Sequence, residues 1–160
     1  MPPTPCPLAG EGQVFRNKRP ESVLVVVYTA TDEVLVLRRR QPPDFWQSVT
    51  GSLHWDEADP LNAARRELCE ETGLDAGLDI VDCGVVNRFP ILPAWRHRYA
   101  PEVVENIEHV FRVQLPKPRS VTLSLSEHSE YVWLPRSVAA VRMTSWTNQA
   151  AVLALPKPTL

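Results

Sequence analysis

The sequence has little of what several protein classes require. Its three cysteines, Cys6, Cys69 and Cys83, form an odd and widely spaced set without a C-x-x-C pair. Such a set favours a reducing compartment over a disulfide framework, and it argues against a zinc site. No apolar run is long enough to span a membrane. The opening residues, MPPTPCPLAGEG, lack the basic-then-apolar order of a signal peptide. We therefore expect a cytoplasmic protein.

The chain also lacks a strong charge of either sign. Its net charge is −2, so no global positive field would attract nucleic acid or a membrane surface. Its 160 residues, of which 44% are hydrophobic, can bury the core of one domain without stabilising disulfides or metals. We expect a single domain over residues 1–160, with residues 1–18 as a loose lead-in. We expect a monomer or weak homo-oligomer that acts on a small molecule.

Apolar runs indicate where the regular elements lie. Short β-branched or alternating runs predict strands, and longer runs with a helical period predict helices. Strands or extended segments are expected at residues 22–28, 34–38, 45–51, 80–87, 107–115 and 130–134, and helical segments at 137–141 and 146–155. A further helix lies between the third and fourth of these strands. Strands on both sides of one helix point to a mixed α/β domain.

That central helix has well-defined ends. Asp59 is a good N-cap, and Pro60 fits the first helical position, where its missing N–H is no loss. Gly73 is a typical stop after the last turn. The spacing of the apolar residues predicts a stripe that docks the helix on a sheet. This stripe consists of Leu61, Ala64 and Leu68.

Three glutamates share another face of the same helix. Glu67, Glu70 and Glu71 stand at positions i, i+3 and i+4, so their side chains project together. Carboxylates this close repel one another, by about 0.2–0.5 kcal/mol per pair. The repulsion turns into attraction when Mg²⁺ or Mn²⁺, which prefer oxygen ligands, lies among them. An isolated E-x-x-E-E is more often a solvated face, so the surrounding residues decide between the two interpretations.

Those residues resemble the signature of the Nudix hydrolases, G-x5-E-x7-R-E-U-x-E-E-x-G-U, in which U is a bulky aliphatic residue. Gly51 and Glu57 occupy the first two fixed positions, and the stretch R-E-L-C-E-E-T-G-L from Arg66 to Leu74 fills the rest. There is one departure: eight residues, 58–65, separate Glu57 from Arg66 where the family has seven. The extra residue lies at the entrance of the helix, where we expect it to bulge the preceding loop.

Blocks outside the signature resemble one branch of that family, the bacterial dihydroneopterin triphosphate diphosphatases of folate biosynthesis. These blocks include RRRQPPDFWQSVTGS, RHRYAPEVVENIEHVF and LSEHSEYVWL, and they run from residue 19 to about residue 151. The resemblance implies an α/β/α Nudix sandwich with a mixed sheet and with the signature as a loop–helix–loop. It also implies a Mg²⁺-dependent pyrophosphohydrolase, with Mn²⁺ as a possible substitute.

The resemblance further implies roles for individual residues. Glu67, Glu70, Glu71 and Glu108 would hold the metal, and Arg66 would orient the cluster through an ion pair to Glu57. The general base stays open between Glu71, Glu108 and a metal-bound hydroxide. Charge, ring shape and loop position give the candidates for phosphate contacts and pterin contacts. They are Arg38, Arg40, Trp46, Gln47, Ser48, Arg96, Arg98, Tyr99 and Asn106.

Two alternatives remain at this point. The first is a Nudix hydrolase of nucleoside triphosphates, oxidised nucleotides or other compounds linked through a nucleoside diphosphate. The same signature serves such substrates, and only the rest of the pocket separates them. The second is a Nudix-like domain that binds without catalysis, which the presence of all three signature glutamates disfavours.

Overall fold

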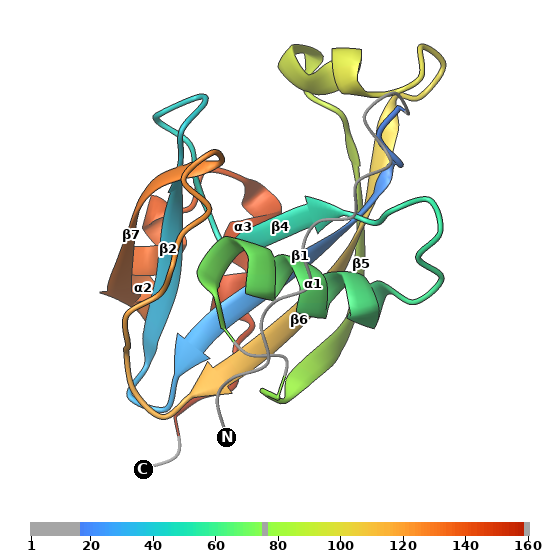
Figure 1. The fold of residues 1–160 in the computed structure, drawn as a ribbon. Helices are drawn as coiled ribbons and strands as arrows, with labels where there is room; N and C mark the ends of the chain where they lie inside the picture. The colour runs from blue at the N-terminus through green and yellow to red at the C-terminus, as the bar shows by residue number, and fades with distance from the viewer. Residues whose placement is uncertain (1–16, 75–76, 159–160) are drawn as a thin grey trace.

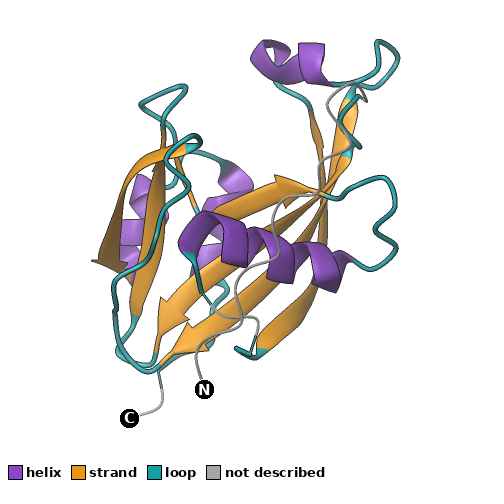
Figure 2. Cartoon of the chain, viewed as in Figure 1, coloured by secondary structure: helices purple, strands orange, loops and turns teal. Residues whose placement is uncertain are grey.

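The computed structural model describes residues 17–74 and 77–158, which form one mixed sheet with helices on both faces (Figures 1 and 2). Most of the expected lead-in, residues 1–16, lies outside the described residues. The elements in chain order are β1 (Glu21–Thr29), β2 (Glu33–Arg39), β3 (Trp46–Gln47), β4 (Val49–Ser52), α1 (Pro60–Thr72), β5 (Ile80–Pro90), the 3₁₀ helix η1 (Pro93–Arg98), β6 (Glu105–Leu115), β7 (His128–Pro135), α2 (Arg136–Arg142) and α3 (Trp146–Leu153). The expected strands and helices are confirmed with shifted ends, except that the extended segment expected at residues 45–51 divides into β3 and β4, which pair with different strands.

Strand β1 is the centre of the sheet. It pairs in parallel with β6 along its whole length and antiparallel with β4 over its first half. Its pairing with β2 is confined to the turn end, where Tyr28 faces Val34. Strand β2 pairs antiparallel with both β3 and β7, and β5 pairs antiparallel with β6. The half-sheet of β2 and β7 therefore diverges from β1, as Figure 1 shows.

The side chains of β1 point alternately to the two faces of the sheet and contribute to a hydrophobic core on each face. Val23, Val25 and Val27 are buried on the face that α1 covers. Val26 and Tyr28 are buried on the other face, against α2 and α3. The period of two in a strand sends successive side chains to opposite faces, so a run of valines buried on both sides requires a layer of helix on each. The α/β/α sandwich with a mixed sheet is confirmed.

Helix α1 begins and ends where the sequence predicts. Asp59 accepts a hydrogen bond from the backbone N–H of Leu61, and Pro60 is the first helical residue. Gly73 adopts a left-handed φ of 69° and donates its N–H to the carbonyl of Cys69. The extra residue before Arg66 therefore lengthens the loop and leaves the helix unchanged.

The cysteines differ from the expectation. Cys69 is disulfide-bonded, whereas the sequence favoured reduced thiols. Cys83 is a free thiol. Cys69 itself is buried, in agreement with a packing role on the helix. Among the described helices, none has the length and apolar character needed to cross a membrane.

Candidate active site

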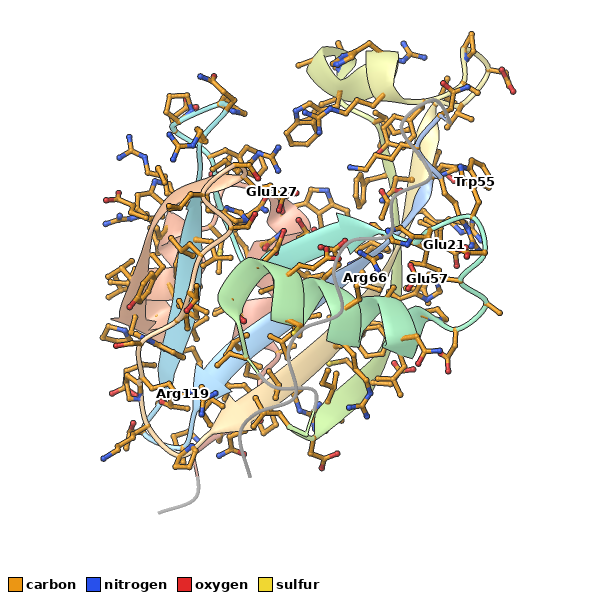
Figure 3. The ribbon with its side chains drawn as sticks, viewed as in Figure 1. Glu21, Trp55, Glu57, Arg66, Arg119 and Glu127 are labelled. Carbon is orange, nitrogen blue, oxygen red and sulfur yellow. The ribbon has the colours of Figure 1, made fainter. Side chains whose placement is uncertain are left out.

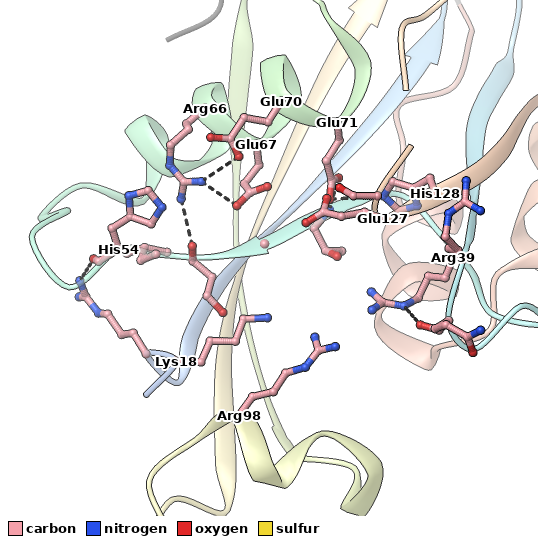
Figure 4. Close-up of a pocket in the computed structure, with 18 of the residues that line it drawn as sticks. Lys18, Arg39, His54, Arg66, Glu67, Glu70, Glu71, Arg98, Glu127 and His128 are labelled. Atoms are coloured by element: carbon pink, nitrogen blue, oxygen red, sulfur yellow. Dashed lines mark hydrogen bonds and ion pairs between the residues drawn. The ribbon is translucent and has the colours of Figure 1, made fainter. Parts of the chain in front are cut away.

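A cleft of about 820 Å³ opens beside the carboxylate face of α1 (Figure 4). Its floor is β4, which contributes Thr50, Gly51 and Ser52. Its walls come from segments far apart in the chain: the start of the described chain, the end of β2, the helix α1, η1 and the turn before β7. Besides the floor, the lining residues used below are Lys18, Arg39, Arg40, Arg66, Glu67, Glu70, Glu71, Arg98, Glu127 and His128.

Two glutamates of α1 rest directly on β4. The carboxyl group of Glu67 lies over Gly51, where an added Cβ would be 2.0 Å from its Cδ and Oε1. One turn further on, the carboxylate of Glu71 accepts a hydrogen bond of 3.1 Å from the backbone N–H of Thr50. The signature glycine therefore leaves room for the Glu67 carboxyl group on β4.

Arg66 joins the loop before α1 to the carboxylates on it. Its guanidinium donates to both carboxylate oxygens of Glu57, at 3.2 and 2.8 Å, and to Glu67 Oε1 at 2.8 Å. It also reaches Glu70 Oε2 at 3.3 Å and the carbonyl of Ser52 at 3.0 Å. The rigid fork of an arginine suits this arrangement. The structure thus contains the predicted ion pair between Arg66 and Glu57 (Figure 3).

The loop with the extra residue is held in place by Arg19. Its guanidinium donates to the carbonyl oxygens of His54 and Glu57, at 2.9 and 2.8 Å. The Glu57 carboxylate accepts from the backbone N–H of His54 at 2.7 Å. These bonds fix the bulged loop, so Glu57 still reaches Arg66 despite the longer spacing. Burial opposes ionisation of Glu57, yet the hydrogen bonds from Arg66 and His54 hold its pKa below the usual value.

The acids on α1 are in an environment that disfavours negative charge. Burial raises the pKa of Glu67 to about 8, with a smaller contribution from Glu71 and against the pull of Arg66. Burial also raises the pKa of Glu71 well above its ordinary value, and the neighbouring carboxyl of Glu127 adds to that rise. A cation bound among these groups would favour their ionised forms and remove the strain of burying them.

Basic side chains face these acids across the cleft. Lys18 and Arg98 point into it from the side opposite α1, and Arg39 lies near Glu71 and Glu127 (Figure 4). Burial, together with the charge of Arg98, lowers the pKa of Lys18. The Lys18 backbone N–H donates to the Arg98 carbonyl at 2.7 Å, which ties the start of the described chain to η1. The cleft therefore presents carboxylates on one wall and cations on the other, which suits a metal-bound polyphosphate.

Comparison with known proteins agrees with this geometry. The NUDIX domain profile matches residues 18–155. The chain belongs to the Nudix family. It is 45% identical over 139 residues to a dihydroneopterin triphosphate diphosphatase of Escherichia coli (strain K12), covering 84% of this chain and 91% of that protein. It is 41% identical over 144 residues to the protein of the same name in Haemophilus influenzae, covering 88% and 89%.

A solved structure shows the same Nudix fold. The structure of the E. coli dihydroneopterin triphosphate pyrophosphohydrolase superposes with a TM-score of 0.80 at 44% identity, covering 85% of this chain and 94% of that one. The likeness extends across both faces of the sheet, since the match includes nearly all of the described chain. It is therefore a likeness of the whole Nudix sandwich as well as of the signature.

Within this Nudix cleft, two residues that the sequence analysis missed stand next to Glu71. Glu127 and His128 come from the turn that leads into β7. With Glu71 they form a group whose possible ligand atoms lie within 4.8 Å of one another. Figure 3 shows Glu127 across the cleft from Glu57 and Arg66. Both residues belong to the block LSEHSEYVWL, but their distance from α1 along the chain gave them no role in the sequence analysis.

Glu108, predicted as a metal ligand and as a candidate base, does not reach the cleft. It lies on β6 with 4% of its surface exposed and accepts a hydrogen bond from Asn87 at 3.3 Å. Burial raises its pKa, against the hydrogen bond from Thr147 of α3. Phe111 and Val113 of the same strand face α1, so Glu108 faces the opposite layer. The prediction placed the right residue type on the wrong side of the sheet.

The arginine triplet at the end of β2 is divided differently from the prediction. Arg38 pairs with Glu130 at 3.1 Å and does not line the cleft, whereas Arg39 and Arg40 do. The pairing of β2 with β7 shifts register between Arg38 and Arg39. That shift breaks the alternation, so the two successive arginines that follow it both border the cleft. The structure therefore adds Arg39, which the sequence analysis did not name, to the residues that line the cleft.

The predicted pterin contacts are also scattered. The guanidinium groups of Arg38 and Arg142 lie 5.6 and 5.0 Å from the centre of the Trp46 ring, so this ring already has two cation–π contacts. Of the two arginines predicted on η1, Arg98 lines the cleft and Arg96 does not. Tyr99, whose pKa is raised by burial, makes a hydrogen bond with Ser52 on the cleft floor.

Three predicted polar residues, Gln47, Ser48 and Asn106, are buried and do not line the cleft. Gln47 donates to the hydroxyl of Thr50 at 3.1 Å, and the backbone N–H of Ser48 donates to Asn148 at 2.8 Å. Asn106 donates to the hydroxyl of Ser22 at 2.8 Å. Within the described part of the chain, Ser48 Oγ and Asn106 Oδ1 have no hydrogen-bond partner. These two atoms keep hydrogen-bonding capacity that a ligand can use.

Proposed function

We propose that this protein is a Mg²⁺-dependent pyrophosphohydrolase. In this proposal it converts dihydroneopterin triphosphate to dihydroneopterin monophosphate and pyrophosphate in folate biosynthesis. One observation carries the proposal: the row of acids on α1 faces Lys18, Arg39 and Arg98 across a single cleft. Two relatives named for this substrate, at 45% and 41% identity, support the choice of substrate.

The carboxylates of the cleft are suited to a divalent cation. Glu70 Oε1 is buried without a hydrogen-bond partner among the described residues, and the carboxyls of Glu71 and Glu127 adjoin one another. We propose that Glu67, Glu70 and Glu71 hold Mg²⁺, for which Mn²⁺ can substitute. The bound metal would neutralise phosphate charge and lower the pKa of a water molecule. Glu127, rather than Glu108, completes the oxygen ligands in this proposal.

The remaining residues of the cleft would position the reacting groups. Lys18, Arg39 and Arg98 would hold the phosphates of the substrate, and Arg66 would keep Glu67 in place through its fork to Glu57. A water molecule attacks a phosphorus atom, the bond to the bridging oxygen breaks, and the proton of the water passes to a base. Glu71 lies beside the proposed metal position and is the candidate base on α1.

Recognition of the pterin is assigned to predicted polar and aromatic residues outside the lining of the cleft. Asn106 and Ser48 would use their free polar atoms, and Gln47 would exchange its bond to Thr50 for one to the ring edge. Tyr99 is the remaining aromatic candidate for stacking, because Trp46 already has cation–π contacts with two arginines. Arg40 would add a further phosphate contact at the rim.

A substrate panel tests the proposed function. The protein would be incubated with Mg²⁺ and either dihydroneopterin triphosphate, a nucleoside triphosphate or an oxidised nucleotide. We expect pyrophosphate as a product and the largest kcat/KM for the pterin substrate. Release of orthophosphate alone, or a much larger kcat/KM for a nucleotide, would favour the alternative Nudix substrates. No turnover of any substrate would favour the non-catalytic alternative.

The wider setting is part of the same proposal. We propose one Nudix domain over residues 1–160, acting in the cytoplasm as a monomer or weak homo-oligomer. It would act on a small-molecule triphosphate without binding nucleic acid or membrane. The net charge of −2 supports the last point. Size-exclusion chromatography with light scattering, thiol titration and cell fractionation test these points separately.

A further inference from the structure

A chain of hydrogen bonds runs from β6 to the loop before α1, along the face of the sheet that α1 covers. His109 Nε2 lies 2.7 Å from Glu21 Oε2, and the other carboxylate oxygen, Oε1, accepts from Arg19 Nη2 at 2.7 Å. Arg19 Nη1 then donates to the carbonyl oxygens of His54 and Glu57, at 2.9 and 2.8 Å. One guanidinium thus connects Glu21 with the loop of Glu57, and Figure 3 shows these two glutamates near one another.

Glu21 is held on both oxygens of its carboxylate. Burial opposes ionisation of Glu21, yet the hydrogen bonds from His109 and Arg19 hold its pKa below the usual value. Because an ionised carboxylate only accepts hydrogen bonds, His109 Nε2 carries the proton in this contact. The side-chain conformation of Glu21 is therefore fixed from two sides, by the neighbouring strand β6 and by Arg19.

The orientation of Arg19 determines where the loop before α1 lies. An arginine side chain has many rotamers, and ordering it costs conformational entropy. Glu21 holds Nη2, which directs Nη1 at two loop carbonyls that are three residues apart. The carbonyl of Glu21 also accepts from the N–H of Leu53 at 2.8 Å, at the start of the same loop. This loop is one residue longer than the family signature, so it has more conformations to restrict.

The carboxylate of Glu57 is the link from this loop to α1. It accepts from the backbone N–H of His54 at 2.7 Å, so the loop backbone sets its position. Both of its oxygens accept from Arg66, at 3.2 and 2.8 Å, and Arg66 donates in turn to Glu67. A change on β6 can therefore reach a carboxylate of the cleft through hydrogen bonds, although His109 is not among the described residues that line the cleft.

Stabilisation of the sheet is a weaker explanation for these contacts. The side chains of Arg19, Glu21 and His109 are 22 to 26% exposed, and ion pairs this accessible to water contribute little to stability. We propose that His109 and Glu21 are positioning residues for Arg66. They act through Arg19, which holds the loop that carries Glu57. Only the effect on catalysis rests on the proposed hydrolase function, because the position of Arg66 can be measured without substrate.

NMR of the metal-free protein tests the position of Arg66, and calorimetry tests its effect on Mg²⁺ binding. The Nε–H signal of Arg66 reports its hydrogen bond to Glu57. We expect His109→Leu to shift this signal and to weaken Mg²⁺ binding about 10-fold, the lower end of the effect of losing an outer-shell partner. His109→Gln offers an amide N–H near the place of Nε2, so it should keep both close to the parent values.

The matched control is Arg88→Gln. Arg88 forms an exposed ion pair of 3.6 Å with Glu105, between β5 and β6, and takes no part in the chain of hydrogen bonds from β6 to the loop before α1. This variant should leave the Arg66 signal and the Mg²⁺ affinity unchanged. Equal shifts of the Arg66 signal in His109→Leu and Arg88→Gln, or in His109→Leu and His109→Gln, would overturn the proposal.

A double-mutant cycle separates action through Arg19 from independent effects. Arg19→Gln breaks the chain beyond Glu21, so adding His109→Leu should change neither the Arg66 signal nor the Mg²⁺ affinity further. Additive effects, or an unshifted Arg66 signal in His109→Leu, would overturn the proposal. If His109→Leu does not fold, Glu21→Gln takes its place, since it has the same shape and loses one acceptor. We expect the same shift there, and its absence would be equally decisive. A substrate panel without turnover would leave these results intact.

Discussion

The carboxyl group of Glu67 occupies the space that any side chain at residue 51 would need. A Cβ on Gly51 would lie 2.0 Å from both Cδ and Oε1 of Glu67, a separation that real atoms do not tolerate. The backbone of Gly51 has no left-handed φ, in contrast to Gly73 and Gly84. The glycine is therefore needed to leave room for the Glu67 carboxyl group, and its conformational freedom is not the reason.

Gly51→Ala should displace Glu67 from the cleft. We expect metal affinity to fall by about 10- to 100-fold, as for the loss of a residue that orients a ligand, and activity to fall with it. Calorimetric titration with Mg²⁺ measures the first effect. The control is Gly84→Ala, since a Cβ there meets nothing within 4 Å although φ is 69°. That variant should lose some stability and bind metal normally; equal metal affinity in both variants would contradict the argument.

Glu108→Gln should make stability less dependent on pH in the metal-free protein. Burial raises the pKa of Glu108 in the folded state above its ordinary value of 4.5. The folded protein then holds this proton more tightly than the unfolded chain does. The resulting stabilisation is complete below pH 4.5 and is lost as the pH rises through the folded pKa. The glutamine cannot ionise, so its unfolding free energy should exceed that of the parent increasingly toward alkaline pH.

Urea unfolding in EDTA at several pH values between 5 and 8 measures this difference. Glu102→Gln, on an exposed loop, is the matched control and should follow the parent. Glu108→Gln should also bind Mg²⁺ with the parent affinity, because Glu108 faces α3 rather than the cleft. Loss of metal affinity in this variant would restore Glu108 to the ligand set.

Trp95→Ala should weaken the binding of the phosphates through Arg39. The Arg39 guanidinium lies 5.1 Å from the centre of the Trp95 ring, and the ring of Phe45 packs against Trp95 at 5.5 Å. A cation–π contact of this kind contributes about 0.5–2 kcal/mol, so KM should rise about 2- to 30-fold with little change in kcat. Trp95→Phe retains an aromatic face, so its KM should lie between that of the parent and that of Trp95→Ala. A fall in kcat at constant KM would count against this positioning role.

Asp59→Ala should cost about 1 kcal/mol of stability, since the side chain caps α1 through the N–H of Leu61 at 3.0 Å. Thermal or urea unfolding measures this cost, and Asp59→Asn should recover most of it because asparagine caps equally well. The affinity for Mg²⁺ should change little, because Arg19 and Glu57 hold the loop independently of the cap. A large loss of metal affinity would show that the cap positions the signature as well.

Local chemistry accounts for the parts of the site that were predicted well. The N-cap at Asp59, the proline after it and the glycine stop at Gly73 act within a few residues of one another, so their sequence spacing determines the helix. The same holds for the shared face of the three glutamates. Helix α1 also begins at Pro60, as the predicted cap at Asp59 requires.

The residues that were predicted poorly depend on which face of a strand a side chain occupies. Glu108 was assigned to the cleft from its resemblance to a family position, yet β6 directs it toward α3. The register shift between Arg38 and Arg39 brings Arg39 to the cleft, whereas the sequence analysis had named Arg38. A shift of one residue moves a side chain to the other face of the sheet, and no local signal in this sequence announces it.

The sequence by itself determined the family, the helix that carries the acids and the ion pair of Arg66 with Glu57, since each depends on short-range spacing. Only the tertiary structure decided which side chains complete the cleft. Lys18, Arg39, Glu127 and His128 are separated from α1 along the chain and meet it through the pairing of β2 with β7 and the contact of residue 18 with η1. The pairing of strands far apart in the chain sets these distances, and this pairing cannot be predicted from composition or from the spacing of residues.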